Sequence, residues 1–164
     1  MAEENFTLST FYSSWKAYQE HIKTSLAPLT AEQLTLRAAS DLRSVGENAA
    51  HIIGCRAGWF IKFLGEEASA EVQAAEQWDV PGAPARTAAE LVQALDWTWQ
   101  LMADSLARWT PADMQKTFPD EWDGKKVELS RAWVVWHVLE HDLHHGGELS
   151  FTLGMHGIPA DFPG

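Results

Sequence analysis

The sequence predicts an all-α fold, a four-helix bundle with a short β-hairpin or extended segment before the last helix. Three observations predict it. Four long stretches place apolar residues at spacings of three and four, as an amphipathic helix does. Several of these stretches open on a helix-capping signal. Asp123-Gly124, between two short extended runs, is a strong signal for a two-residue hairpin turn. At 164 residues the chain is expected to form a single domain, residues 1–164.

The first two helices are predicted over residues 8–26 and 44–64. Pro28 ends the first, and residues 30–33 have capping-box form for one short helical turn. The second opens on the capping box of residues 44–47 and is predicted to stop at Gly65. These boundaries leave only a short connection between the two helices.

The second half of the chain repeats this organisation after a break. Residues 66–86 contain the breakers Pro81-Gly82 and Pro84, which predict a loop with at most one helical turn. A capping box opens a third helix over residues 87–109, and the hairpin is predicted over 118–129. Ser130 is expected to cap a fourth helix that runs to Leu153 and ends at Gly154. Long helices with mostly short connections are typical of a helix bundle.

Composition excludes several classes of protein. With a formal net charge of −11 and only twelve Lys and Arg residues, the chain lacks the basic patch that nucleic-acid binding requires. Cys55 is the only cysteine, so an internal disulfide is excluded. No apolar run approaches the ~20 residues that cross a bilayer, and the acidic N-terminus does not resemble a signal peptide. We therefore expect a cytoplasmic protein that binds neither nucleic acid nor membrane.

Four of the seven histidines lie close together on the predicted fourth helix. His137, His141 and His145 are spaced by four residues and so share one helix face, whereas His144 points about 100° away from His145. Neighbours on such a face have Cβ atoms about 6 Å apart, which lets two imidazoles bind one cation. The pattern predicts a metal site.

A catalytic metal site commonly has three protein ligands, so a third ligand is needed. His51, in an apolar stretch of the predicted second helix, is either that ligand or a hydrogen-bonded core histidine. His137 is an alternative third ligand and otherwise lines the site. His21 is expected at the surface, and His156 lies beyond the last helix without a metal role.

Taken together, these motifs resemble the DinB-like superfamily of bacterial four-helix metalloproteins. The resemblance rests on a histidine within the second helix and on the segment His141-Asp-Leu-His144-His145 in the fourth, and it covers nearly the whole chain. It implies His51, His141 and His145 as the metal ligands and a homodimeric assembly. The chain departs from the pattern at Gly146-Gly147-Glu148, where many members have Arg-Gly-Gln, so no arginine function carries over.

The resemblance also implies a chemistry. Related proteins include thiol-dependent S-transferases and isomerases, so the leading hypothesis is a transferase that uses a small-molecule substrate and a low-molecular-weight thiol. The cofactor is expected to be a divalent metal ion, zinc or nickel, with iron as an alternative. A metal-dependent hydrolase and a non-catalytic metal-binding or small-ligand-binding stress-response protein are the alternatives. No catalytic residue can be named, although Glu148 or His137 would be the base in a hydrolase.

The remaining polar residues near the motif have two interpretations each. Glu148, three residues after His145, either orients that imidazole through its second nitrogen or is a solvated residue near the helix end. His144 is expected to make a helix-packing or inter-subunit hydrogen bond. Cys55 is expected to be a packing residue, and Glu47 is explained by its capping box.

Overall fold

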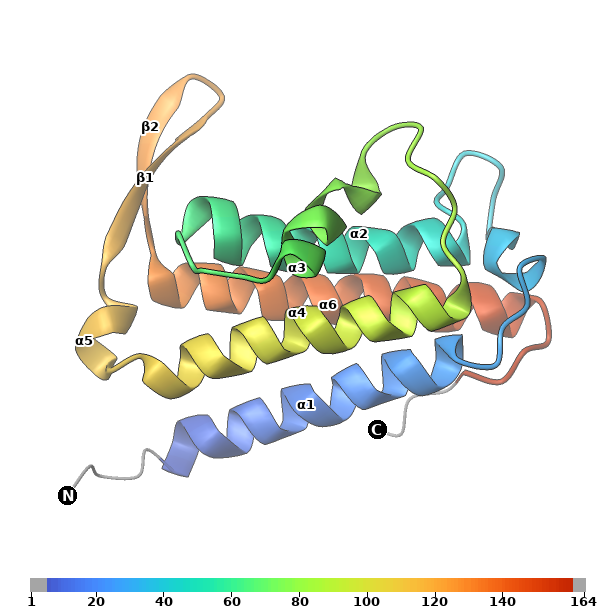
Figure 1. The fold of residues 1–164 in the computed structure, drawn as a ribbon, viewed down its shortest axis with the longest axis horizontal. Coiled ribbons are helices and arrows are strands. Elements are labelled where there is room, and N and C mark those ends of the chain that lie inside the picture. The colour runs from blue at the N-terminus through green and yellow to red at the C-terminus, as the bar shows by residue number, and fades with distance from the viewer. Residues whose placement is uncertain (1–5, 161–164) are drawn as a thin grey trace.

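Four long helices run side by side, as predicted (Figure 1). The computed structural model describes residues 6–160, with side chains from Tyr12 onward. The long helices are α1 (Phe6–Leu26), α2 (Val45–Ala57), α4 (Ala88–Arg108) and α6 (Arg131–Met155). The shorter elements are two 3₁₀ helices, η1 (Gln33–Thr35) and η3 (Glu76–Asp79), a π-helical turn η2 (Gly58–Phe63), the helices α3 (Ala70–Ala75) and α5 (Pro111–Met114), and the strands β1 (Thr117–Trp122) and β2 (Lys125–Ser130).

The directions of the helices show where the long connection lies. Helices α1 and α6 run one way along the bundle, whereas α2 and α4 run the other way (Figure 1). Because α2 and α4 are parallel, the chain between them must travel back along the length of the bundle. This crossover, residues 64–87, is drawn in green in Figure 1 and includes α3 and η3.

The predicted capping boxes are present at two of the long helices. At α2 the Ser44 hydroxyl accepts a hydrogen bond from the Glu47 amide at 3.2 Å, and the Glu47 carboxylate accepts one from the Ser44 amide at 2.7 Å. Thr87 and Glu90 make the same reciprocal pair at α4. Each box satisfies backbone amides that have no partner within the helix.

The hairpin before α6 is confirmed. Strands β1 and β2 pair antiparallel from Thr117–Ser130 to Trp122–Lys125. Asp123 and Gly124 form the turn with φ values of 50° and 74°. Two successive positive φ angles define the tight hairpin turn that Asp-Gly favours.

Three boundaries differ from prediction. Helix α6 continues through Gly154 to Met155, because Gly157, with φ 72°, adopts the left-handed conformation that ends it. Helix α2 changes to π-helical geometry at Gly58. Residues 66–86 are more than a loop, because α3 buries Val72 and Ala75 against the bundle and η3 continues from it.

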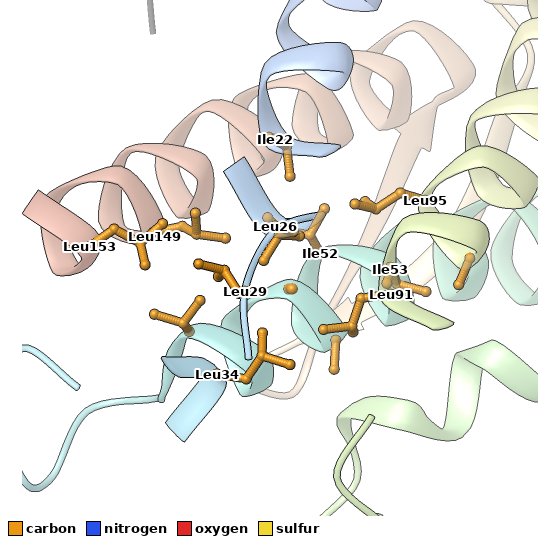
Figure 2. Close-up of a cluster of buried hydrophobic side chains, with 14 of the residues drawn as sticks. Ile22, Leu26, Leu29, Leu34, Ile52, Ile53, Leu91, Leu95, Leu149 and Leu153 are labelled. Carbon is orange, nitrogen blue, oxygen red and sulfur yellow. The ribbon is translucent and has the colours of Figure 1, made fainter. Parts of the chain in front are cut away.

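The core contains two apolar clusters, one towards each end of the bundle. The first is rich in leucine and isoleucine and is shown in Figure 2; it includes Ile22, Leu26, Leu29, Leu34, Ile52, Ile53, Leu91, Leu95, Leu149 and Leu153. The second is more aromatic and includes Trp15, Phe60, Met102, Val134 and Val138. On every long helix the residues of the two clusters are separated by a buried polar position: Gln19, Arg56, Thr98 and Asp142.

These polar positions form a hydrogen-bonded layer that joins all four long helices. Arg56 on α2 and Asp142 on α6 are fully buried and pair at 2.7 Å. Asp142 also accepts a 2.7 Å hydrogen bond from the Trp15 indole, and Arg56 donates one of 2.7 Å to Gln19. Gln19 in turn donates to the Leu95 carbonyl. A buried charge pair is tolerated only when its groups are satisfied in this way.

Within residues 6–160, none of the helices combines the length and hydrophobicity that a membrane span needs.

Replacing Arg56 by methionine, of similar volume, should lower the free energy of unfolding by about 3 to 5 kcal/mol, because Asp142 would keep a buried charge without its partner. Urea denaturation followed by circular dichroism measures this. Lys62→Met is the control, since the Lys62 side chain is 65% exposed and its pair with Glu76 should be worth at most about 1 kcal/mol. Equal losses in the two variants would contradict the role given to Arg56.

Candidate metal centre

Three histidines predicted from the sequence come together between α2 and α6. The Nε2 atom of His51 lies 3.0 Å from Nε2 of His141 and 3.1 Å from Nε2 of His145. All three side chains are partly buried. Two nitrogens bound at about 2.1 Å to one tetrahedral ion would be about 3.4 Å apart, so these atoms need to separate only slightly to hold one ion.

Two carboxylates fix the tautomer of the His51 and His145 rings. Nδ1 of His51 lies 2.5 Å from the Asp79 carboxylate, and Nδ1 of His145 lies 2.7 Å from that of Glu148. Because carboxylates accept hydrogen bonds, both rings carry their proton on Nδ1 and present an Nε2 lone pair to the other ring. Two lone pairs that face each other at 3.1 Å repel unless a cation lies between them. Two carboxylates with three neutral imidazoles also balance the charge of a divalent ion.

Helix geometry and two interhelical hydrogen bonds position the triad. The spacing of four on α6 places His141 and His145 on one face. Asn48 on α2 donates to the backbone carbonyl of His145 at 3.0 Å, which holds α2 against α6 at this level. One turn of α6 is also fixed by Tyr18 of α1, whose hydroxyl donates to the Leu143 carbonyl at 3.1 Å.

Gly146 makes the approach of Tyr18 possible. A Cβ atom at position 146 would lie 2.5 Å from the Tyr18 hydroxyl oxygen, which is closer than Cβ atoms come to nonbonded atoms. Position 146 is where the chain departs from the Arg-Gly-Gln pattern. Here it serves the packing of α1 on α6.

Asp79 is the site residue that the sequence did not reveal. It lies in η3, within the segment predicted as a loop, and 28 residues from His51. Gly54 of α2 lets η3 approach, because a Cβ there would lie 3.1 Å from the Asp79 Cβ. The only local signal was Gly54 itself, one turn beyond His51, and a glycine within a helix indicates close packing without naming the partner.

His141 is held neutral by its surroundings. Burial, followed by repulsion from the neighbouring imidazoles, lowers the pKa of His141 to about 2. Burial also lowers the pKa of His145, although Glu148 opposes this. Nδ1 of His141 is buried and has no hydrogen-bond partner among the described residues. Neutral imidazoles are the form that binds metal.

Glu148 and His144 form an exposed pair beside the triad. Glu148 orients His145, as one of the two sequence interpretations had it, and its second oxygen lies 3.1 Å from Nε2 of His144. Burial raises the pKa of Glu148, but the hydrogen bond from His145 and the adjacent imidazole charges lower it overall. Although His144, His145 and Glu148 lie close enough to be considered a second metal site, they are already engaged with one another.

The other predicted residues lie outside the triad. His137 stacks on Trp133 with ring centroids 4.9 Å apart and is 6.1 Å from the His141 ring, so the structure does not bring it into the triad. His156 lies 2.9 Å from the Arg37 carbonyl, away from the triad. His21 is half-buried rather than fully at the surface. Burial raises the pKa of Cys55 to about 12, which agrees with a packing role.

Fold and site together define a class: helical bundles in which the second and last long helices bring three histidines to one point. The model of the DinB family matches residues 1–160, so the chain belongs to the DinB family. A crystal structure of a DinB-like protein from Bacillus cereus ATCC 10987 has a similar fold, with a TM-score of 0.70 and 17% sequence identity over 94% of this chain and 95% of that one. A search among curated proteins gave no significant match.

The metal-free protein should lose stability as the pH falls from 7 to 5. The unfolded chain takes up a proton at His141 near pH 6.5, whereas the folded protein does not until about pH 2, so acid favours unfolding. The loss approaches about 1.4 kcal/mol per pH unit for this one proton. Urea denaturation in the presence of a chelator measures it, and His141→Gln should have a shallower pH dependence. Parallel curves for the two proteins would show that His141 is protonated normally in the fold.

Proposed function

We propose that His51, His141 and His145 bind one divalent metal ion and that the protein is a metal-dependent enzyme. The proposed reaction is the transfer of a low-molecular-weight thiol to an electrophilic small molecule. One observation carries the metal assignment: three Nε2 atoms converge while carboxylates hold the Nδ1 protons of two of the rings. We propose zinc or nickel as the ion, with iron as the alternative; imidazole ligands suit all three.

A bound divalent ion with three protein ligands has an open position and would supply a Lewis acid that favours the thiolate form of a co-substrate thiol. The chain's own residues prepare that position. Asp79 and Glu148 hold two imidazoles in the metal-binding tautomer. A carboxylate bonded to the second nitrogen of an imidazole also raises the basicity of the ring. The buried Arg56–Asp142 pair joins α2 to α6 close to the triad, with Asp142 directly after His141, and keeps the rings in register.

The state of Cys55 supports the use of an external thiol. It is the only cysteine in the chain, and its pKa near 12 keeps it protonated at neutral pH. Because a thiol reacts as its thiolate, Cys55 is a poor nucleophile. The attacking sulfur in an S-transfer would therefore come from a co-substrate.

An aromatic surface next to the triad supports an apolar substrate. His137 stacks on Trp133 at 4.9 Å, and Trp59 packs on the edge of both rings at 5.0 and 5.7 Å. Trp122 of the hairpin extends this surface and is 44% exposed. Flat side chains beside a metal centre offer the electrophile a place to lie. His137 would then contact substrate rather than metal.

The two alternatives have less support. Hydrolysis needs a base near the metal-bound water, yet Glu148 is engaged with His145 and His144, and the His137 ring is stacked on Trp133, 6.1 Å from the His141 ring. A non-catalytic metal-binding protein would need only the triad and would leave the aromatic surface unexplained. The homodimer and the cytoplasmic location stay predictions. Exposed apolar side chains along α6, including Leu143, Phe151 and Met155, support the homodimer.

Metal content should follow the triad. Wild-type protein should bind one zinc or nickel ion per chain, and His51→Ala or His141→Ala should abolish this, as measured by mass spectrometry of the dialysed protein. Asp79→Asn should weaken binding about 10- to 100-fold, because His51 loses the acceptor that orients it.

Two matched controls separate these effects from general damage. His137→Ala removes the same side chain one turn away on α6, and Glu76→Gln changes a carboxylate on η3 that pairs with Lys62. Both should keep one ion per chain. Unchanged metal content in His141→Ala would refute the proposed site.

The transfer reaction can be tested with the metal-loaded protein, monochlorobimane as the electrophile and a panel of cysteine-based low-molecular-weight thiols. Fluorescent conjugate should form faster than in the absence of protein, and His141→Ala should remove the acceleration. Because Cys55 is assigned no chemical role, Cys55→Ala should keep it. If one ion binds but no thiol is transferred, the metal site stands and the transferase assignment fails.

A further inference from the structure

A concave site lies on the crossover between α2 and α4, and its lining does not include the three histidines. It has a volume of about 530 Å³, is open to solvent, and is lined by residues of α3, η3, the segment 80–86 and α4. Its walls are mostly apolar, with Trp78 of η3, Trp97 of α4, Val80, Pro81 and Pro84. This volume falls in the range of small-molecule sites, which combine apolar walls with a few polar groups.

Arg86 is the only basic residue that lines this pocket. Its guanidinium lies over the Trp78 ring, 4.3 Å from the centroid, which holds it in place by a cation–π contact. Its Nε is buried and has no hydrogen-bond partner among the described residues. The ion pair that it makes with Glu90 has an N–O distance of 3.7 Å, too long for a good hydrogen bond.

Glu90 does not turn towards Arg86 because the capping box holds it. One carboxylate oxygen of Glu90 accepts hydrogen bonds from the Thr87 amide and hydroxyl, each at 2.8 Å. Arg86 is therefore left with one donor, Nε, that no described residue fills, and with an Nη1 group whose carboxylate partner on Glu90 is 3.7 Å away. An arginine with unfilled donors beside an apolar wall is suited to a planar carboxylate.

Glu71 is the acidic residue of the pocket lining, and its charge does not cancel the preference of Arg86 for a carboxylate. Its carboxylate interacts with the Ser69 hydroxyl, which lowers its pKa, and it is exposed to water. Water screens an exposed charge more strongly than a partly buried one. Arg86 is the better placed of the two charges, because 26% of its side chain is exposed and one face is covered by Trp78.

We propose that this pocket binds a small organic acid with an aromatic or apolar body, with the carboxylate on Arg86 and the body against Trp78 and Trp97. The walls are preorganised, since Pro81 and Pro84 restrict the backbone and Gly82 makes the turn between them with φ 81°. A wall that is rigid before binding loses less entropy when a ligand arrives. The pocket lining includes neither the three histidines nor Asp79 and Glu148.

The test uses 3-phenylpropionate and its neutral amide, 3-phenylpropanamide, which share the same body and differ in charge. Each is titrated into the full-length, metal-free protein while ¹H–¹⁵N spectra follow the indole signals, with those of Trp78 and Trp97 assigned by Trp→Phe substitution. The acid should shift both indole signals in a saturable manner. The amide should bind at least ~10-fold more weakly, because it cannot form charge-assisted hydrogen bonds.

Arg86→Gln should lower the affinity for the acid to that for the amide. The matched control, Arg108→Gln, removes an arginine that pairs with Glu66 near the other end of α4 and should leave acid binding unchanged. The proposal is overturned if neither indole shifts up to millimolar acid, or if acid and amide bind equally well. The second comparison uses wild-type protein, so it stands even if a variant fails to fold.

Discussion

The buried Arg56–Asp142 pair holds together the two helices that carry the three histidines. It lies between the two apolar clusters and joins α2 to α6, while Trp15 and Gln19 connect it to α1. Apolar helix faces can slide past one another at small cost, whereas a buried charge that loses its partner is strongly destabilising. The pair therefore fixes the register of α2 against α6. Asp142 directly follows His141, so the same register brings His51 to the other two histidines.

The triad shows how a bundle can hold neutral imidazoles close together. His141 is neutral because it is buried, whereas His51 and His145 are oriented by Asp79 and Glu148. His51 and His145 thus each have their second nitrogen satisfied, which is the usual requirement for a histidine that binds metal. The arrangement stores repulsion between lone pairs that a cation would relieve. The same contacts between α2 and α6 therefore form the triad and pack the two helices.

The sequence predicted the fold well because its signals are local. Helical periodicity, the capping boxes and Asp123-Gly124 each act within a few residues, and the structure confirms them. The spacing of His141 and His145 is also local, so the prediction of a helix over these residues was enough to predict that they lie close together. Asp79 could not be predicted, because its contact with His51 depends on how the crossover packs at Gly54. Contacts between segments far apart in sequence leave no periodic signal.

The crossover between α2 and α4 carries more of the functional surface than its composition indicates. A bundle with parallel α2 and α4 requires a connection along its whole length, and this one folds into α3 and η3 instead of remaining a loop. The single turn of η3 faces two ways: Asp79 contacts His51, while Trp78 forms a wall of the pocket at Arg86. A shift of η3 would move both. The geometry of the histidine site is therefore tied to a surface segment as well as to the core.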